Sequence, residues 1–259
     1  MNIGLIGNGN LALYLLQMIN VENKIEGQII SILGRNESRR KKIENTYNIN
    51  FFTNFDEFIH SSIDLVIEVA TVDTAKQYTK DILKNNKDII VGSVGALKES
   101  DFVQEITRIA LDNNKYIYLP SGAIGGLDLL QAANSLGGLR KVSITTVKSP
   151  LSLGKENTNK EEVLFEGSAA EAIDKFPKNV NVALILSLAG IGVESTKTFV
   201  KVNPDIDNNI HIINAEGSFG EMEIKIKNNP MPNNPKTSYL AALSIISTLK
   251  NIHNNIKIG

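Results

Sequence analysis

Short apolar runs alternate with longer amphipathic segments through the first half of the chain. Continuous apolar strands are typical of a parallel sheet that helices cover on both faces. Segments such as Asn10–Asn20 and Thr74–Asn85 have the periodicity of such covering helices. The alternation therefore predicts right-handed crossovers and a doubly wound α/β sheet. The strands expected in this sheet are 2–7, 28–33, 64–70, 88–92 and 116–119.

The second half has a different pattern. In Met222–Lys227 the apolar side chains point one way and the charged ones the other, which is typical of a half-exposed antiparallel strand. Gly217 and Gly220 can supply the turn that pairs this strand with 210–216. The other elements expected here are strands at 141–148 and 162–166, helices at 168–176 and 179–189, and a final helix over 237–251.

The change of pattern predicts two domains. We expect a doubly wound domain over 1–119 and a mixed α/β domain over 120–235. A C-terminal helix within 236–259 is expected to pack back on the first domain.

Composition narrows the function classes. The chain has 259 residues, 27 Lys plus Arg against 28 Asp plus Glu, and no cysteine. A near-neutral balance argues against nucleic acid as a partner, and the absence of thiols excludes disulfides and cysteine-ligated metals. The longest apolar stretch, 180–193, is interrupted by polar residues and glycines, so no membrane span is expected. With no signal peptide in view, we expect a soluble, cytoplasmic protein.

A glycine-rich turn follows the first strand and opens the first helix. It reads Gly7-Asn8-Gly9-Asn10-Leu11-Ala12, a G-x-G-x-x-A pattern. In such a turn the first glycine permits the tight bend, the second lets a diphosphate approach the backbone, and the small third residue allows close helix packing. The context of strand, turn and helix predicts a Rossmann-type dinucleotide site formed by Gly7, Asn8, Gly9, Asn10 and Leu11.

The end of the second strand bears on the choice of cofactor. NAD sites usually place an acidic residue there, whereas NADP sites place an arginine nearby. This chain has Leu33-Gly34-Arg35, followed by Arg39 and Arg40. We expect that NADP is accepted, alone or alongside NAD, with Arg35 facing the 2′-phosphate; a solvated helix start is the alternative reading.

Three segments of the second half carry candidate chemistry: 119–128, 176–183 and 208–213. In the last of them, His211 is expected on a strand, on the same face as Ile213 and Ala215. A histidine on an apolar face is more often a core residue than a catalyst, so the residues alone leave its role open.

Taken together, these motifs resemble the L-aspartate dehydrogenase family over nearly the whole chain. Val69 is a departure from the family, which often has cysteine at that position. The motifs that carry the resemblance are the glycine turn, Ile67–Ala70, Ser93–Leu97, Ser121–Leu127, Phe165–Ser168, Phe176–Ala183, Asn209–His211 and Asn234–Ser238.

The resemblance implies an activity and a set of site residues. It implies reversible NAD- or NADP-dependent deamination of L-aspartate to iminosuccinate, and then to oxaloacetate and ammonia, which can feed NAD biosynthesis. It places His211 on the catalytic histidine, and Ala70, Ala123 and Asn181 at the cofactor. It also implies a homodimer whose contacts lie in the second domain.

The chemistry of this reaction adds expectations for individual side chains. The substrate amine must be neutral when hydride leaves, and histidine has an ordinary pKa near 7 that suits a proton acceptor. The two substrate carboxylates need cationic or N–H-rich partners. For each candidate lysine, the alternative is a solvated surface residue without a role in binding. No metal is expected, because hydride transfer needs none. The candidate carboxylate partners are Lys148, Lys236, Thr237 and Ser238.

Two other functions are compatible with the glycine turn. One is another two-domain NAD(P)-dependent reductase, of the homoserine dehydrogenase or dihydrodipicolinate reductase type. The other is a regulator that senses NAD(P) without turnover, although no basic helix-turn-helix segment is visible.

Overall fold

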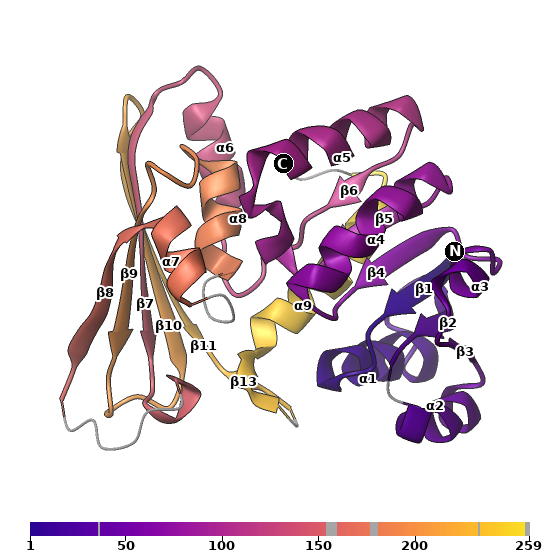
Figure 1. The fold of residues 1–259 in the computed structure, drawn as a ribbon. Coiled ribbons are helices and arrows are strands. Elements are labelled where there is room, and N and C mark those ends of the chain that lie inside the picture. The colour runs from indigo at the N-terminus through magenta and orange to yellow at the C-terminus, as the bar shows by residue number, and fades with distance from the viewer. Residues whose placement is uncertain (36, 154–159, 177–180, 233, 257–259) are drawn as a thin grey trace. The chain divides into compact units, whose positions relative to one another are not determined.

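The computed structural model describes residues 1–35, 37–153, 160–176, 181–232 and 234–256. The chain forms two compact units. Unit 1 contains Met1–Pro120 and Ile245–Ile258, and unit 2 contains Ser121–Ser244. Figure 1 labels their elements.

A six-stranded sheet forms the centre of unit 1 (Figure 1). All its neighbouring strands are parallel, in the order β3-β2-β1-β4-β5-β6. This is the strand order of a dinucleotide-binding Rossmann sheet, in which successive strands are added on one side of β1 and then, from β4, on the other. The doubly wound fold predicted from the sequence is therefore confirmed. The strands are β1 (Asn2–Ile6), β2 (Gln28–Leu33), β3 (Asn50–Phe52), β4 (Leu65–Glu68), β5 (Asp88–Val91) and β6 (Ile117–Tyr118).

Helices pack on both faces of this sheet. Alternate residues of β1 point to opposite faces, so Ile3 and Leu5 join one apolar cluster while Gly4 faces the other side. A Cβ on Gly4 would lie 2.7 Å from the Phe58 ring, so glycine here allows close helix packing. The first face carries α1 (Asn10–Leu16), α2 (Arg40–Tyr47) and the C-terminal part of α9 (Tyr239–His253). The remaining helices are α3 (Phe55–Ile59), α4 (Val72–Lys84) and α5 (Ser100–Asp112).

A five-stranded sheet forms the frame of unit 2, in the order β11-β10-β7-β9-β8. Strands β7 and β9 are parallel, and the other neighbouring pairs are antiparallel. The turn predicted between Gly217 and Gly220 joins β10 to β11. The strands are β7 (Leu139–Lys148), β8 (Glu162–Ser168), β9 (Lys197–Val202), β10 (Asn209–Gly217) and β11 (Gly220–Asn228). A short pair of strands, β12 (Pro230–Met231) and β13 (Asn234–Ser238), follows.

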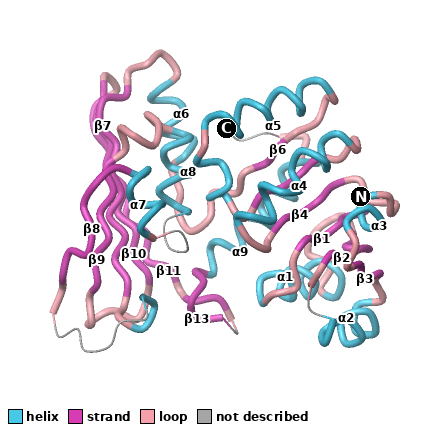
Figure 2. The backbone as a smooth tube through the Cα atoms, viewed as in Figure 1, coloured by secondary structure: helices cyan, strands magenta, loops and turns pink. Residues whose placement is uncertain are grey.

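The helices of unit 2 lie on one face of this sheet, as Figures 1 and 2 show. They are α6 (Leu127–Asn134), α7 (Ala169–Lys175) and α8 (Asn181–Ala189). Ser168 begins α7 with a reciprocal capping box, in which its side chain accepts from Glu171 and the Glu171 carboxylate accepts from the Ser168 backbone. The opposite face of the sheet bears no helix of the described chain.

One local prediction needs correction. Thr237 and Ser238 belong to β13, which pairs with β12, and the final helix begins at Tyr239. The predicted start of α8 before Asn181 lies outside the described residues.

Within the described residues, no helix combines the length and apolar character that crossing a membrane requires.

Candidate functional site

The glycine turn of unit 1 closes the carboxyl end of β1. Gly7 has a φ of +115°, and a Cβ there would lie 2.9 Å from the backbone oxygen of Val69. A larger residue at this position would have a strained backbone, and its side chain would clash with the segment that follows β4. A Cβ on Gly9 would meet nothing within 4 Å, so open space adjoins the backbone where a diphosphate would approach. Helix α1 begins directly after Gly9, without a side-chain cap.

A cleft of about 310 Å³ opens at this edge of the sheet. It lies at the carboxyl ends of β1, β2 and β4, the place where open α/β sheets bind ligands. Asn10 and Leu11, also expected at the cofactor, begin α1 and do not line the cleft. The predicted residues that line it are Gly7, Asn8, Gly9, Arg35 and Ala70, together with Thr53, Thr71 and Tyr78, which sequence reasoning missed.

Two arginines of the predicted basic cluster lie at this cleft or its turn. Arg35 is exposed and lines the cleft directly after Gly34. Arg39 donates from Nη1 to the backbone oxygen of Asn8 at 2.9 Å, and so ties the segment after β2 to the glycine turn. Arg40 instead pairs with Glu44 at 3.2 Å along α2. Among the described residues, the end of β2 presents arginine and no carboxylate to the cleft.

Glu68, at the end of β4, is a site residue that sequence reasoning missed. Its side chain is 0% exposed. Oε1 accepts from the Ala70 backbone at 2.7 Å and from the Ser93 hydroxyl at 2.9 Å, and Oε2 accepts from the Ser93 backbone at 3.0 Å. Burial raises the pKa of Glu68, and these hydrogen bonds oppose that rise. The carboxylate therefore orders Ala70 at the edge of the cleft. Its signal was a single acid inside an apolar strand.

In unit 2, His211 lies on β10 and is 3% exposed. It shares its buried face with Ile213 and Ala215, as predicted. Its partner across the sheet is Thr146 of β7, and Thr146 Oγ1 lies 3.0 Å from His211 Nδ1. Burial, followed by the positive charge of Lys148, lowers the pKa of His211 to about 3. The pKa of His211 lies below the ordinary value of histidine because the strand carries the ring out of water and next to a cation.

Lys148 ends β7 on the same face as Thr146, and is 7% exposed. Burial lowers the pKa of its ammonium group to about 8. The alternative reading of a solvated surface lysine is therefore excluded for this residue. A buried cation can bind a carboxylate, and a neutral imidazole beside it can accept a proton.

A second group of polar residues connects other predicted positions to the strand that carries His211. Asn209 lies two residues before His211 and donates to the Ser238 hydroxyl at 3.2 Å. Asn228 of β11 lies opposite Asn209 and donates to the backbone oxygen of Ala123 at 3.0 Å. Ala123 and Ser238 thus belong to the surroundings of β10. Asn209 lies in the motif Asn209–His211 that carries the resemblance, whereas Asn228 had no sequence signal that separated it from other asparagines.

The remaining candidates have different placements. Asn181 is exposed at the start of α8, and a Cβ on Gly122 would lie 4.0 Å from Val182, the next residue. Thr237 accepts from Asn234 at 2.8 Å within β13. The side chain of Lys236 lies outside the described residues.

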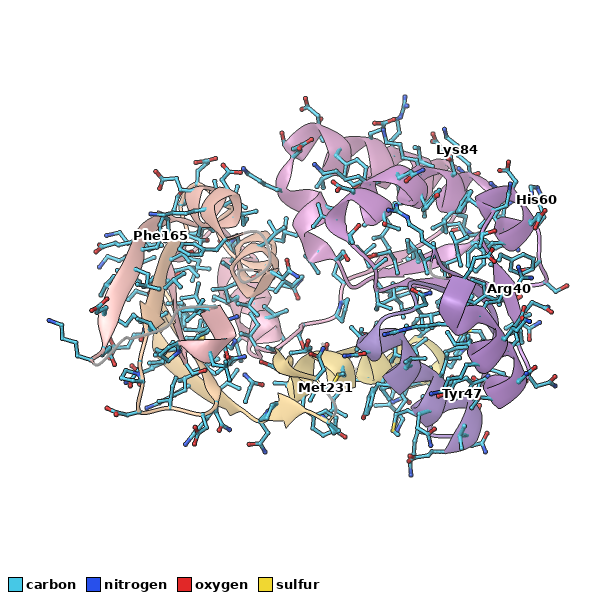
Figure 3. All side chains as sticks on the ribbon, turned by 60° about the horizontal axis from the view of Figure 1, so that its bottom comes forward. Arg40, Tyr47, His60, Lys84, Phe165 and Met231 are labelled. Carbon is cyan, nitrogen blue, oxygen red and sulfur yellow. The ribbon has the colours of Figure 1, made fainter. Side chains whose placement is uncertain are left out.

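The other two histidines are exposed, and Figure 3 shows His60 at the surface of unit 1. Among the described side chains, no group of histidine and acidic residues has the arrangement of a metal site.

Comparison with known proteins assigns both parts of the chain. Residues 3–120 match the homoserine dehydrogenase NAD-binding domain, and residues 128–252 match the C-terminal domain of aspartate dehydrogenase. L-aspartate dehydrogenase of Methanosarcina mazei is 38% identical and is aligned over 100% of this chain and 99% of its own. The enzyme of Archaeoglobus fulgidus is 37% identical over 97% of this chain and 98% of its own.

Solved structures agree with this assignment. Aspartate dehydrogenase of Thermotoga maritima has a TM-score of 0.80 and 30% identity, over 100% of this chain and 99% of its own. Scyllo-inositol dehydrogenase of Lactobacillus casei, at a TM-score of 0.62 and 12% identity, shares the fold alone. The predicted resemblance is confirmed, and with it an oxidoreductase that uses NAD or NADP. The chain belongs to the L-aspartate dehydrogenase family.

Proposed function

We propose that the chain oxidises the Cα–N bond of L-aspartate reversibly, with His211 as the group that takes the proton from the substrate amine. The observation that carries this assignment is the buried imidazole of His211, held by Thr146 and next to the buried cation of Lys148. A dicarboxylic amine needs such a combination of a cation and a proton acceptor.

The other residues have binding roles in this proposal. The turn Gly7-Asn8-Gly9 binds the diphosphate, with Asn10 and Leu11 beginning the helix beside it, and Ala70 borders the same cleft. Ala123 and Asn181 contact the nicotinamide end. Lys148 and Ser238 bind substrate carboxylates, with Thr237 and Lys236 as neighbours. The cofactor, when bound, supplies the acceptor for the hydride that leaves Cα.

The decisive experiment is an assay of the purified protein with oxaloacetate and ammonium, followed by the absorbance of NADH and then of NADPH. We expect oxidation of reduced cofactor that depends on both oxaloacetate and ammonium, and the reverse reaction with L-aspartate. Homoserine serves as the control substrate, because the first domain matches a homoserine dehydrogenase domain. Turnover of homoserine without turnover of aspartate would assign the chain to the other class of reductase, and cofactor binding without any turnover would favour a sensor.

Arg35 is the proposed contact for the 2′-phosphate of NADP. Removing its charge in Arg35→Ala is expected to raise the KM for NADPH about tenfold and to leave the KM for NADH nearly unchanged, since a charged hydrogen bond contributes about 1.5–3 kcal/mol. Arg40→Ala is the matched control, because Arg40 pairs with Glu44 on α2. An Arg35→Ala variant with the wild-type ratio of the two KM values would contradict this role.

We also propose a homodimer formed through the face of the unit 2 sheet that bears no helix. Ile210 and Ile212 of β10 and Phe199 of β9 are only half-buried there, although they are apolar. Light scattering is expected to give the mass of two chains, and Ile212→Lys should convert the dimer to a monomer.

A cytoplasmic location and the supply of iminosuccinate to NAD biosynthesis complete this proposal, on the strength of the family resemblance.

A further inference from the structure

A glycine-rich loop of unit 2, residues 121–126, precedes α6 and contains Ala123. Gly122 and Gly126 have φ angles of +67° and +76°, a backbone conformation that other residues rarely adopt. A Cβ on Gly126 would clash with Ile224 of β11, so the loop lies close against that strand. A loop with this backbone freedom keeps a single conformation only where tertiary contacts fix it.

Two side chains from distant parts of the sequence hold the backbone of this loop. Asn228 of β11 donates from Nδ2 to the backbone oxygen of Ala123 at 3.0 Å. Ser244 of α9 accepts from the backbone nitrogen of Gly122 at 3.1 Å. Asn228 is only 4% exposed, so water does not compete for its hydrogen bond. A carbonyl oxygen can only accept, so the position of Asn228 requires a side chain that donates.

Asn228 also belongs to the sheet face on which His211 lies. It is paired with Asn209 of β10, two residues before His211, and the register continues with Ile226 opposite His211. Side chains two residues apart on a strand share a face, and so do side chains directly opposite each other. The hydrogen bond from Asn228 therefore fixes the backbone of Ala123 relative to the strand that carries the imidazole.

We propose that Asn228 is a positioning residue for hydride transfer, which holds the Ala123 backbone against the nicotinamide end of the cofactor at a fixed place relative to His211. This inference rests on the proposed function, in which Ala123 contacts that end of the cofactor. Hydride transfer requires closely aligned donor and acceptor carbons, and a displacement of about 1 Å can lower the rate about 10²-fold. Without the bond from Asn228, the glycine-rich loop would be free to move by such an amount.

A binding experiment tests this role without turnover. NADH and ADP-ribose share the adenosine and the diphosphate, but only NADH has the nicotinamide ring. In Asn228→Leu, which removes the donor and keeps the size of the side chain, the Kd for NADH is expected to rise about two- to tenfold, the range for one net hydrogen bond. The Kd for ADP-ribose should stay unchanged, because the diphosphate turn belongs to unit 1. Calorimetry measures both constants.

A matched control lies in the same unit. Asn134, at the end of α6, donates to the backbone oxygen of Gly190 at 2.8 Å. Asn134→Leu therefore removes a bond of the same kind and should keep both wild-type Kd values. Asn228→Ala removes the donor without adding a branched side chain, and should give the same two results as Asn228→Leu. Wild-type affinity for NADH in both Asn228 variants, or an equal loss of affinity for NADH and ADP-ribose, would overturn the proposal.

Turnover tests the consequence for alignment. Asn228→Leu is expected to lower kcat for L-aspartate about 10–100-fold per NADH-binding site, with little change in the KM for aspartate. Counting sites by NADH titration separates misalignment from a loss of folded enzyme, which would leave this kcat unchanged. Asn134→Leu should keep the wild-type value, and the same value in Asn228→Leu would refute the role of Asn228. A wild type inactive on aspartate would instead refute the proposed function, while the comparison of NADH with ADP-ribose would still decide the role of Asn228.

Discussion

Replacing His211 with Gln is expected to lower kcat/KM for L-aspartate by about 10²–10⁴-fold, the usual contribution of a positioned general acid or base. The amide of glutamine can form hydrogen bonds but cannot accept the substrate's proton. Affinity for NADH, measured by fluorescence titration, should be unchanged, because the diphosphate turn belongs to unit 1 and His211 to unit 2.

The exposed histidines supply the controls for this experiment. His60→Gln and His253→Gln make the same chemical change on the surface, where both side chains contact solvent. These variants should retain wild-type kinetics. A His211→Gln enzyme as active as these controls would remove His211 from the chemistry and return it to the alternative reading of a core residue.

Replacing Lys148 with Met is expected to stabilise the protein while impairing substrate binding. Burial lowers the pKa of Lys148 from 10.5 to about 8 in the folded chain. A shift of this size corresponds to roughly 3 kcal/mol of opposition to folding when the group is charged. Methionine has a similar apolar length and no charge, so Lys148→Met should raise the free energy of unfolding by up to about 3 kcal/mol at neutral pH.

The pH dependence identifies the source of this stabilisation. Between about pH 8 and 10.5 the unfolded chain holds the Lys148 proton and the folded chain releases it, so wild-type stability rises with pH in this window. The advantage of the Met variant is therefore complete below pH 8 and disappears toward pH 10.5. Urea unfolding at several pH values measures it, and Lys225→Met on the exposed side of β11 is the control. A pH-independent difference between Lys148→Met and wild type would contradict this account.

The same substitution should affect the reaction in the opposite direction. If Lys148 binds a substrate carboxylate, its loss is expected to raise the KM for aspartate about 10–100-fold, which corresponds to one charged hydrogen bond. A more stable protein with a normal KM would show that Lys148 is buried for another reason. The unfavourable buried charge would then have no role in substrate binding.

Local pattern was sufficient for much of the fold and for the cofactor cleft. The apolar runs at β1, β2, β4 and β5 are continuous because helices cover both faces of their sheet. The glycine turn was recognisable because its pattern requires small residues at fixed positions. Gly7 illustrates this, since its φ of +115° is a conformation that other residues rarely adopt. By contrast, β3 was missed, since its three residues carry too few positions for a periodicity to be detected. Strand β9 was also missed, although it is as long as β2.

Contacts between distant residues were beyond the reach of these patterns. Glu68 gained its role from Ser93, which lies 25 residues later, and Ala123 gained its support from Asn228, 105 residues away. Thr237 and Ser238 were expected in the final helix, yet they belong to β13, which pairs with β12. Such outcomes depend on which partners the folded chain brings together.

By itself, the order of residues determined the doubly wound sheet, the diphosphate turn and the face of β10 on which His211 lies, because these follow from side-chain size and a repeat of two along a strand. Tertiary structure alone decided the surroundings that set the pKa of His211. The pairing of β7 with β10 sets Thr146 opposite His211, across 65 residues of sequence, and Lys148 on the same face. A pKa responds to the water removed and the charges gathered around a group, and both are properties of the folded chain.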